Sequence, residues 1–136
     1  MTRQISIAAL VLRLSLGTVF IAHALLKVLV FTLPGTAQFF ESSGFPGWAA
    51  YPVTAIELIG GVLLVAGVMT RYAAVALLPV ILGATFVHMD AGWLFTNPNG
   101  GWEYPAFLAA ALVVQALLGG GEFSLATKRH PLPATA

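Results

Sequence analysis

The stretch ISIAALVLRLSLGTVFIAHALLKVLVF, residues 5–31, decides the fold class of this chain. It is apolar and exceeds the ~20 residues that a helix needs to cross a hydrocarbon core of ~30 Å. Three ionisable side chains interrupt it: Arg13, His23 and Lys27. A charged side chain in hydrocarbon costs about 2.5–3.5 kcal/mol on insertion scales, so such side chains usually face protein or trapped water. We therefore predict a membrane helix whose polar face marks the interior of a helical bundle.

Three further apolar segments follow at residues 51–69, 72–89 and 103–121. The connections at residues 33–50 and 90–102 contain glycine and proline, with asparagine in the latter, which favour turns. We expect residues 70–71 to form a tight connection. The sequence therefore predicts an all-α fold, an integral membrane antiparallel four-helix bundle. We expect one domain over residues 1–136, in which residues 122–136 form a mobile tail.

The composition also points to the membrane and excludes several kinds of site. Hydrophobic residues make up 59% of the chain and charged residues only 8%, whereas globular domains average about 25% charged residues. The absence of cysteine excludes disulfides, iron–sulfur clusters ligated by this chain and thiolate metal sites. A net charge of +1 without a basic stripe argues against nucleic acid as a partner. We expect the lipid membrane as the surroundings of the chain and no metal site.

The charges outside the apolar segments predict how the chain is oriented. Four basic residues fall on one side of the membrane if the segments alternate: Arg3, Arg71, Lys128 and Arg129. The opposite connections contain no lysine or arginine, and their charged residues are all acidic: Glu41, Asp90 and Glu103. The positive-inside rule then places both termini in the cytoplasm. Arg13 interrupts the apolar run that a signal peptide needs, so we expect the first segment to be retained as a helix.

Glu57 is the ionisable residue of the second span, and its depth suggests a partner. At ~1.5 Å per residue, Arg13 lies about 15 Å above Arg3 and Glu57 about 21 Å above Arg71. Antiparallel neighbours would bring the two side chains within reach, so we predict an Arg13–Glu57 ion pair inside the membrane. Such a pair is equally compatible with a clamp that fixes helix register and with a catalytic role.

A second polar group is expected near the outer boundary of the membrane. His23 and Lys27 are four residues apart and therefore share one helix face. Lys27 either extends its amine to the interface or meets one of the outer acidic residues: Glu41, Asp90 or Glu103. His88, at the end of the third span, would lie at the same level. Two histidines without recognisable spacing are weak evidence for haem, so we expect none.

Several motifs together resemble the DoxX family of small four-span bacterial membrane proteins. They are LRLSLG at residues 12–17 followed by His23 and Lys27, ELIGG at 57–61, GWEYP at 101–105 and GGG at 119–121. The resemblance implies a multi-pass protein of the bacterial inner membrane. Its relatives include the membrane subunit of a thiosulfate–quinone oxidoreductase and members of assemblies linked to thiol and oxidative-stress defence. It directs attention to six residues: Arg13, His23, Lys27, Glu57, Arg71 and Glu103.

These observations support a quinone-interacting membrane subunit of an oxidoreductase complex, with a polar site inside the bundle near the outer face. A quinone would be the cofactor, and a protein partner or a second copy of the chain is expected. The catalytic candidates are His23, Lys27 and Glu57, and the ligand-binding candidates add Arg13, His88 and Glu103. Two alternatives stay open: a transport module for a small solute or protons, and a membrane anchor or assembly factor without catalysis.

Overall fold

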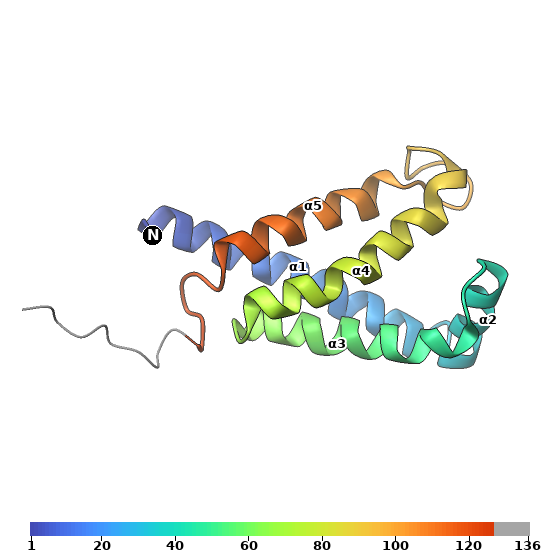
Figure 1. Cartoon of the computed structure of the whole chain (residues 1–136), viewed down its shortest axis with the longest axis horizontal. Coiled ribbons are helices and arrows are strands. Elements are labelled where there is room, and N and C mark those ends of the chain that lie inside the picture. Colours follow the sequence, from blue (N-terminus) through green and yellow to red (C-terminus); the bar gives the residue numbers. More distant parts are fainter. Residues whose placement is uncertain (127–136) are drawn as a thin grey trace, which may run out of the picture.

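The computed structural model describes residues 1–126, and this part of the chain contains helices and no strand. Its elements in chain order are α1 (Arg3–Leu29), α2 (Leu33–Ser42), the 3₁₀ turn η1 (Gly47–Ala49), α3 (Ala50–Ala66), α4 (Thr70–His88), the 3₁₀ turn η2 (Met89–Ala91) and α5 (Glu103–Leu118) (Figure 1). The predicted all-α class is confirmed.

Three helical stretches are long and apolar enough to cross a membrane: Arg3–Leu29, Gly47–Ala66 and Thr70–Ala91. The fourth, α5, is apolar but has only 16 residues. Large apolar side chains cover the outside of these helices, and Leu29, Phe107 and Leu117 are each at least 70% exposed. A surface of this kind is stable in lipid rather than in water. The chain is therefore a membrane helical bundle.

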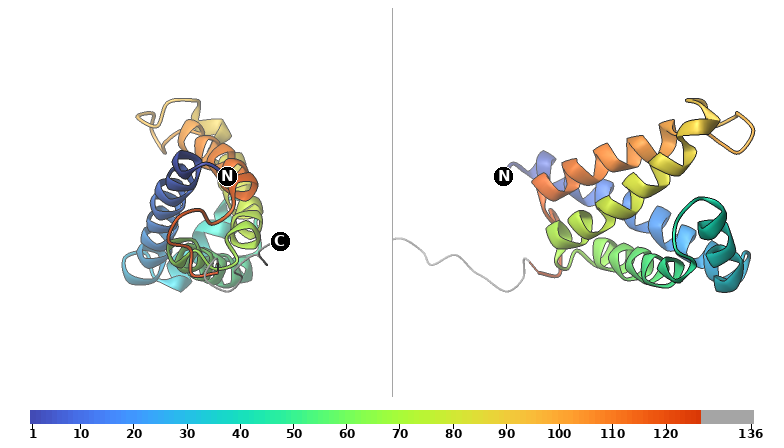
Figure 2. Two further views of the ribbon diagram at one scale, coloured as in Figure 1. Left: turned by 90° about the vertical axis from the view of Figure 1, so that its left-hand side faces the viewer. Right: turned by 45° about the vertical axis from the view of Figure 1, so that its right-hand side comes forward.

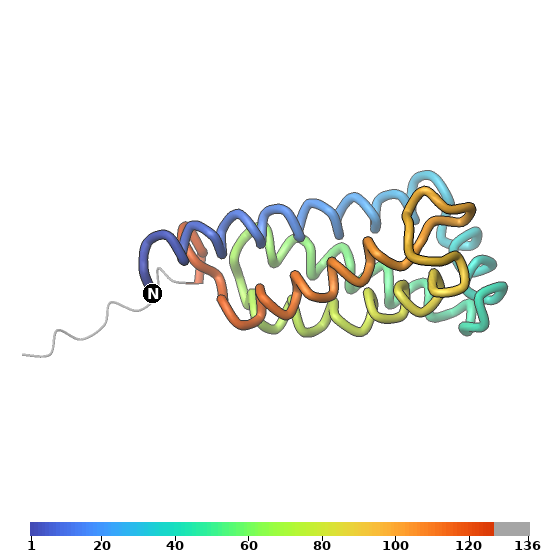
Figure 3. Tube along the Cα trace, turned by 90° about the horizontal axis from the view of Figure 1, so that it is seen from above, coloured from blue at the N-terminus to red at the C-terminus, as the bar shows by residue number. Residues whose placement is uncertain are grey.

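The four long helices run side by side along the long axis of the molecule (Figure 3). The most extensive contacts join α1 to α3 and α4 to α5, and the two pairs meet along α3 with α4 and along α1 with α5. The pairs lie close together at the end that holds the N-terminus and spread apart toward the end that holds α2 (Figures 1 and 2). Residues of both pairs and of α2 line a cavity at that end.

Small residues set the approach of α1 to α3. A Cβ atom on Gly17 would lie only 2.7 Å from the carbonyl oxygen of Gly61, so the two helix backbones touch at this point. Gly60 lies against Leu77 of α4 in the same way, where an added Cβ would meet the leucine at 2.9 Å. Glycine permits this close approach because it has no side chain. Helices in lipid gain stability from the van der Waals packing that results. Fully buried leucines fill the adjoining core: Leu64, Leu77 and Leu112.

The long connection between the first two spans contains a helix of its own. The hydroxyl of Thr32 accepts a hydrogen bond from the backbone N–H of Gly35 at 3.2 Å and caps α2 at its N-terminus. Pro34 follows in the first turn of the helix, where its missing N–H costs nothing. Helix α2 lies at the open end of the bundle (Figures 1 and 2).

The prediction that residues 122–136 form a mobile tail is wrong for residues 122–126. The backbone N–H of Glu122 donates to the carbonyl oxygen of Ser6 at 3.1 Å. Ser124 is buried, and its hydroxyl donates to the carbonyl oxygen of Gly67 at 2.5 Å. This segment therefore closes the N-terminal end of the bundle. Residues 127–136, which include Lys128 and Arg129, lie outside the described residues.

Candidate functional site

The predicted Arg13–Glu57 pair is wrong, because the Arg13 guanidinium binds backbone carbonyl groups instead. It donates to the carbonyl oxygens of Leu64 (3.1 Å) and Val65 (2.5 Å) at the end of α3. It also donates to those of Gly120 (2.8 Å) and Glu122 (3.0 Å) beyond α5. The last carbonyls of a helix lack partners and carry partial negative charge, which a buried guanidinium satisfies. Arg13 is only 1% exposed and joins three segments of the chain.

The expected pairing failed because α1 extends beyond the end of α3 (Figure 1). The contact of Gly17 with Gly61 fixes the register of the two helices. One turn before Gly17, Arg13 therefore lies opposite the last turn of α3 and not opposite Glu57. The first turns of α1 pack against the segment after α5 instead, as the bond between Ser6 and Glu122 shows.

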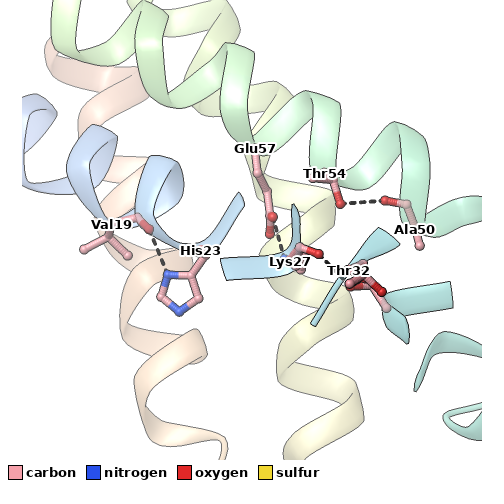
Figure 4. A network of polar contacts seen from close by, with 8 residues as sticks. Val19, His23, Lys27, Thr32, Ala50, Thr54 and Glu57 are labelled. Carbon is pink, nitrogen blue, oxygen red and sulfur yellow. Dashed lines mark hydrogen bonds and ion pairs between the residues drawn. The ribbon is translucent and has the colours of Figure 1, made fainter. Parts of the chain in front are cut away.

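Glu57 pairs with Lys27 of α1 (Figure 4). The distance from Lys27 Nζ to Glu57 Oε2 is 2.5 Å, and the side chains are 19% and 7% exposed. Helical side chains point toward the N-terminus of their helix, so that of Lys27 runs back along α1 to the level of Glu57. Both alternatives for Lys27, an amine extended to the interface and a pair with an outer acidic residue, are therefore wrong. Glu103 instead accepts a hydrogen bond from the backbone N–H of Phe95 at 3.3 Å.

The Lys27–Glu57 pair faces a cavity of about 850 Å³ between the diverging helix pairs. Side chains of α1, α2, α3, α4, α5 and the α4–α5 connection form its wall, and most of them are apolar. Four ionisable site candidates line it: His23, Lys27, Glu57 and His88. An apolar cavity with a few convergent polar groups is the usual form of a small-molecule site. We take it as the candidate functional site.

The two histidines of the cavity are held in the same way. Nδ1 of His23 lies 2.8 Å from the carbonyl oxygen of Val19, and Nδ1 of His88 lies 2.7 Å from that of Ala84. A carbonyl oxygen only accepts, so Nδ1 carries the proton in both rings. In the neutral ring Nε2 is then an acceptor, and after protonation it becomes a donor. Figure 4 shows the His23 ring with Nδ1 turned toward its own helix and Nε2 turned away from it.

Two of the predicted ligand-binding residues, Arg13 and Glu103, do not line the cavity. Sequence reasoning missed the contribution of α2, which adds Thr36 and Phe39 to the wall. It also missed Tyr104 of α5, whose ring centroid lies 6.4 Å from that of His23. The signal for α2 was the Thr32 cap followed by Pro34, which is typical of a helix start.

Comparison with known proteins identifies the family. The DoxX family model matches residues 8–90. The matched stretch begins inside α1 and ends just after α4, so it includes the Lys27–Glu57 pair and both cavity histidines. Over 84 residues the chain is 42% identical to a protein of Bacillus subtilis (strain 168) named "Putative oxidoreductase CatD". The match covers 62% of this chain and 61% of that relative, so less than two thirds of the relative's length is matched. No solved structure matches the chain. Since the family model covers more than half of its residues, the chain belongs to the DoxX family.

Proposed function

We propose that this protein is the membrane subunit of an oxidoreductase and that it binds a quinone in the cavity beside Lys27 and Glu57. The single observation that carries the proposal is the cavity itself, an apolar space of about 850 Å³ in which a lysine, a carboxylate and two histidines converge. The name of the Bacillus relative supports oxidoreductase chemistry. The quinone is our inference from the shape and chemistry of the site.

A quinone headgroup is a flat apolar ring with two carbonyl acceptors, and the cavity offers matching groups. The ammonium of Lys27 has three N–H donors, and Glu57 Oε2 is its partner in the ion pair. A further donor of this ammonium would bind a quinone carbonyl. Nε2 of neutral His23 would accept a hydrogen bond from a quinol hydroxyl. The site therefore has partners for both redox forms.

The electrons require a partner protein. Reduction of a quinone to a quinol takes up two electrons and two protons, and the chain has no cysteine with which to hold a cluster. We propose a partner with a flavin or metal centre that exchanges electrons with the bound quinone. The residues of this chain would bind the headgroup and exchange protons, for which histidine and glutamate are suitable.

The proposed setting is the bacterial inner membrane, with α5 as a fourth span. At 1.5 Å per residue α5 is about 24 Å long, slightly less than the hydrocarbon thickness. Trp93 and Trp102 lie near the start of α5 and pack edge to face with ring centroids 4.5 Å apart. Tryptophan is enriched at membrane–water interfaces, so this position suits the end of a span. Arg3 is the first residue of α1 and Arg71 the second residue of α4, and both lie at the opposite end of the bundle. The positive-inside rule then directs that end to the cytoplasm.

Gentle extraction from native membranes, followed by mass spectrometry of bound lipids, tests this function. We expect a quinone to co-purify with the wild-type protein and to be lost in His23→Gln. Thr18→Val is the matched control, because the Thr18 hydroxyl only bonds back to Leu14 on the outside of the same helix (2.7 Å). Native protein without quinone would contradict the proposal. Proton or solute flux through liposomes that contain this chain alone would favour a transport module instead.

A further inference from the structure

A second, smaller cavity adjoins the first at the open end of the bundle. Its volume is about 390 Å³, and α2, the end of α4, η2 and the α4–α5 connection contribute to its wall. Four residues line both cavities and form the wall between them: Phe39 and Ser43 from the α2 side, Val87 and His88 from the α4 side. This group, which we call the neck, separates the ligand cavity from the smaller cavity, whose wall includes the exposed Asp90.

His88 is the titratable member of the neck. The titratable groups that face the ligand cavity with it are His23 and Lys27 on α1, Glu57 on α3 and Tyr104 on α5. The titratable group that faces the smaller cavity with it is Asp90, which is exposed. Within residues 1–126, His88 alone among ionisable side chains lines both spaces.

The opposite end of the ligand cavity has no comparable polar route. Between it and the N-terminal end lie Leu64, Leu77 and Leu112, all with 0% exposure. Beyond them the Arg13 guanidinium is bonded to backbone carbonyls. A proton would have to cross an apolar core to reach that face, which is energetically unfavourable.

We infer that His88 relays protons between the ligand cavity and the aqueous face at which α2 and η2 lie, and that the cavity exchanges protons with this face alone. The inference rests on the proposed quinone site. Nε2 of neutral His88 takes a proton from a quinol hydroxyl, so that an O–H bond breaks and an N–H bond forms. The imidazolium then passes this proton to water or Asp90 in the smaller cavity. The second hydroxyl proton leaves through the same two steps, and the two electrons pass to the flavin or metal centre of the partner. Quinone reduction runs in reverse.

The geometry of His88 suits this step. Its Nδ1–H remains bonded to the carbonyl of Ala84 at 2.7 Å, which fixes the ring while Nε2 gains or loses a proton. Gly100 of the α4–α5 connection packs against the Cδ2–Nε2 edge of the ring, where an added Cβ would lie 3.5 Å from Cδ2. His88 is half-buried, so it contacts both the apolar cavity and water.

The test measures proton access to a bound probe. The coloured 2-hydroxy-1,4-naphthoquinone is bound at saturation to the full-length protein in lipid nanodiscs, and stopped-flow pH jumps report the protonation of its hydroxyl by absorbance. We expect His88→Gln to slow this step on the order of 100-fold, the lower end of what a positioned proton-transfer group contributes. The matched control is Thr85→Val on the same helix, since the Thr85 hydroxyl only bonds back to the carbonyl oxygen of Ile81 (2.8 Å) and Thr85 lines neither cavity. Its rate at saturation should stay at the wild-type value.

A second arm blocks the neck. Because the chain contains no cysteine, Ser43→Cys and Ser42→Cys each introduce a single thiol. A positively charged methanethiosulfonate reagent should slow exchange when attached at position 43, which lines both cavities, and not at position 42, which lines neither. Wild-type rates in both His88→Gln and blocked Ser43→Cys would overturn the relay while leaving the quinone site intact. If the naphthoquinone does not bind the wild-type protein, both proposals are wrong.

Discussion

Lys27 of α1 and Glu57 of α3 form an ion pair, 2.5 Å between Nζ and Oε2, on the wall of an apolar cavity inside the membrane bundle. Replacing two such buried charges by apolar residues is often neutral or stabilising, whereas removing one of them is costly. Stability alone therefore does not explain the presence of this ion pair. Its position beside a cavity that could hold a small molecule suggests that it is retained for binding.

The first prediction separates a role of the Lys27–Glu57 pair in stability from a role in ligand binding. Glu57→Gln leaves the Lys27 ammonium without its anion and should lower the free energy of unfolding by about 3 kcal/mol, the low end for a broken buried pair. Combining Lys27→Met with Glu57→Leu should restore stability to near the wild-type value but abolish binding of the quinone. Unfolding in mixed detergent micelles and quinone content measure the two effects. A double variant that binds quinone like the wild type would contradict the role of the pair in binding.

The second prediction concerns Arg13 as a structural clamp. Arg13→Met removes the side-chain donor of the Val65, Gly120 and Glu122 carbonyls, whereas the Leu64 carbonyl keeps the N–H of Gly67 at 3.2 Å. Each buried polar group that loses its partner costs about 1–3 kcal/mol, so we expect a large loss of thermal stability. Quinone affinity of the protein that remains folded should not change, because Arg13 does not line the cavity. Weaker binding at unchanged melting temperature would show that Arg13 acts on the ligand.

The third prediction tests the α1–α3 contact with two glycines. In Gly61→Ala the new Cβ would lie 2.9 Å from the carbonyl oxygen of Gly17, so the helices must separate. Overpacking of this kind costs about 1–3 kcal/mol. Gly83→Ala is the control, since no atom lies within 4 Å of its added Cβ. Alanine there should leave stability unchanged or raise it by about 0.5–1 kcal/mol. Equal effects of both substitutions on unfolding would refute the close contact.

The fourth prediction concerns the segment after α5. Ser124→Ala removes the hydroxyl that donates to Gly67 and should cost about 1–3 kcal/mol, because the Gly67 carbonyl oxygen is left unpaired. Leu125→Ala in the same segment should have little effect, since Leu125 is 54% exposed. Hydrogen exchange at the Glu122 and Leu125 amides, both bonded to other segments, provides a second readout. Fast exchange at both amides in the wild type would contradict the packed segment.

Apolar segment lengths were sufficient to predict the helices of the bundle, because a membrane helix needs a long, predominantly apolar run. The positions of the ionisable residues predicted which face of α1 turns inward. Arg13 is buried, and His23 and Lys27 line the cavity. Helix register was not predictable in this way. Depth estimates assumed that the basic residues Arg3 and Arg71 lie at one level, whereas the Gly17–Gly61 contact sets the actual alignment.

The members of the cavity wall were only partly predictable. His23, Lys27, Glu57 and His88 stood out because ionisable residues in an apolar segment are conspicuous. The partner of Lys27 did not follow from its position near a helix end, because a lysine side chain reaches back along the helix by about one turn. The wall contributed by α2 depends on how a connection folds over the bundle, which a single sequence does not specify.

Photo-crosslinking with an azidoquinone tests the central claim most directly, because it locates the quinone on the chain without requiring a partner protein. Labelled peptides would be identified by mass spectrometry, with and without excess unmodified quinone. We predict competed labelling within the cavity wall, at residues such as Val19, Val53 and Leu108. Label that is found only on outward-facing residues such as Leu117, or that excess quinone does not displace, would contradict a quinone site beside Lys27 and Glu57.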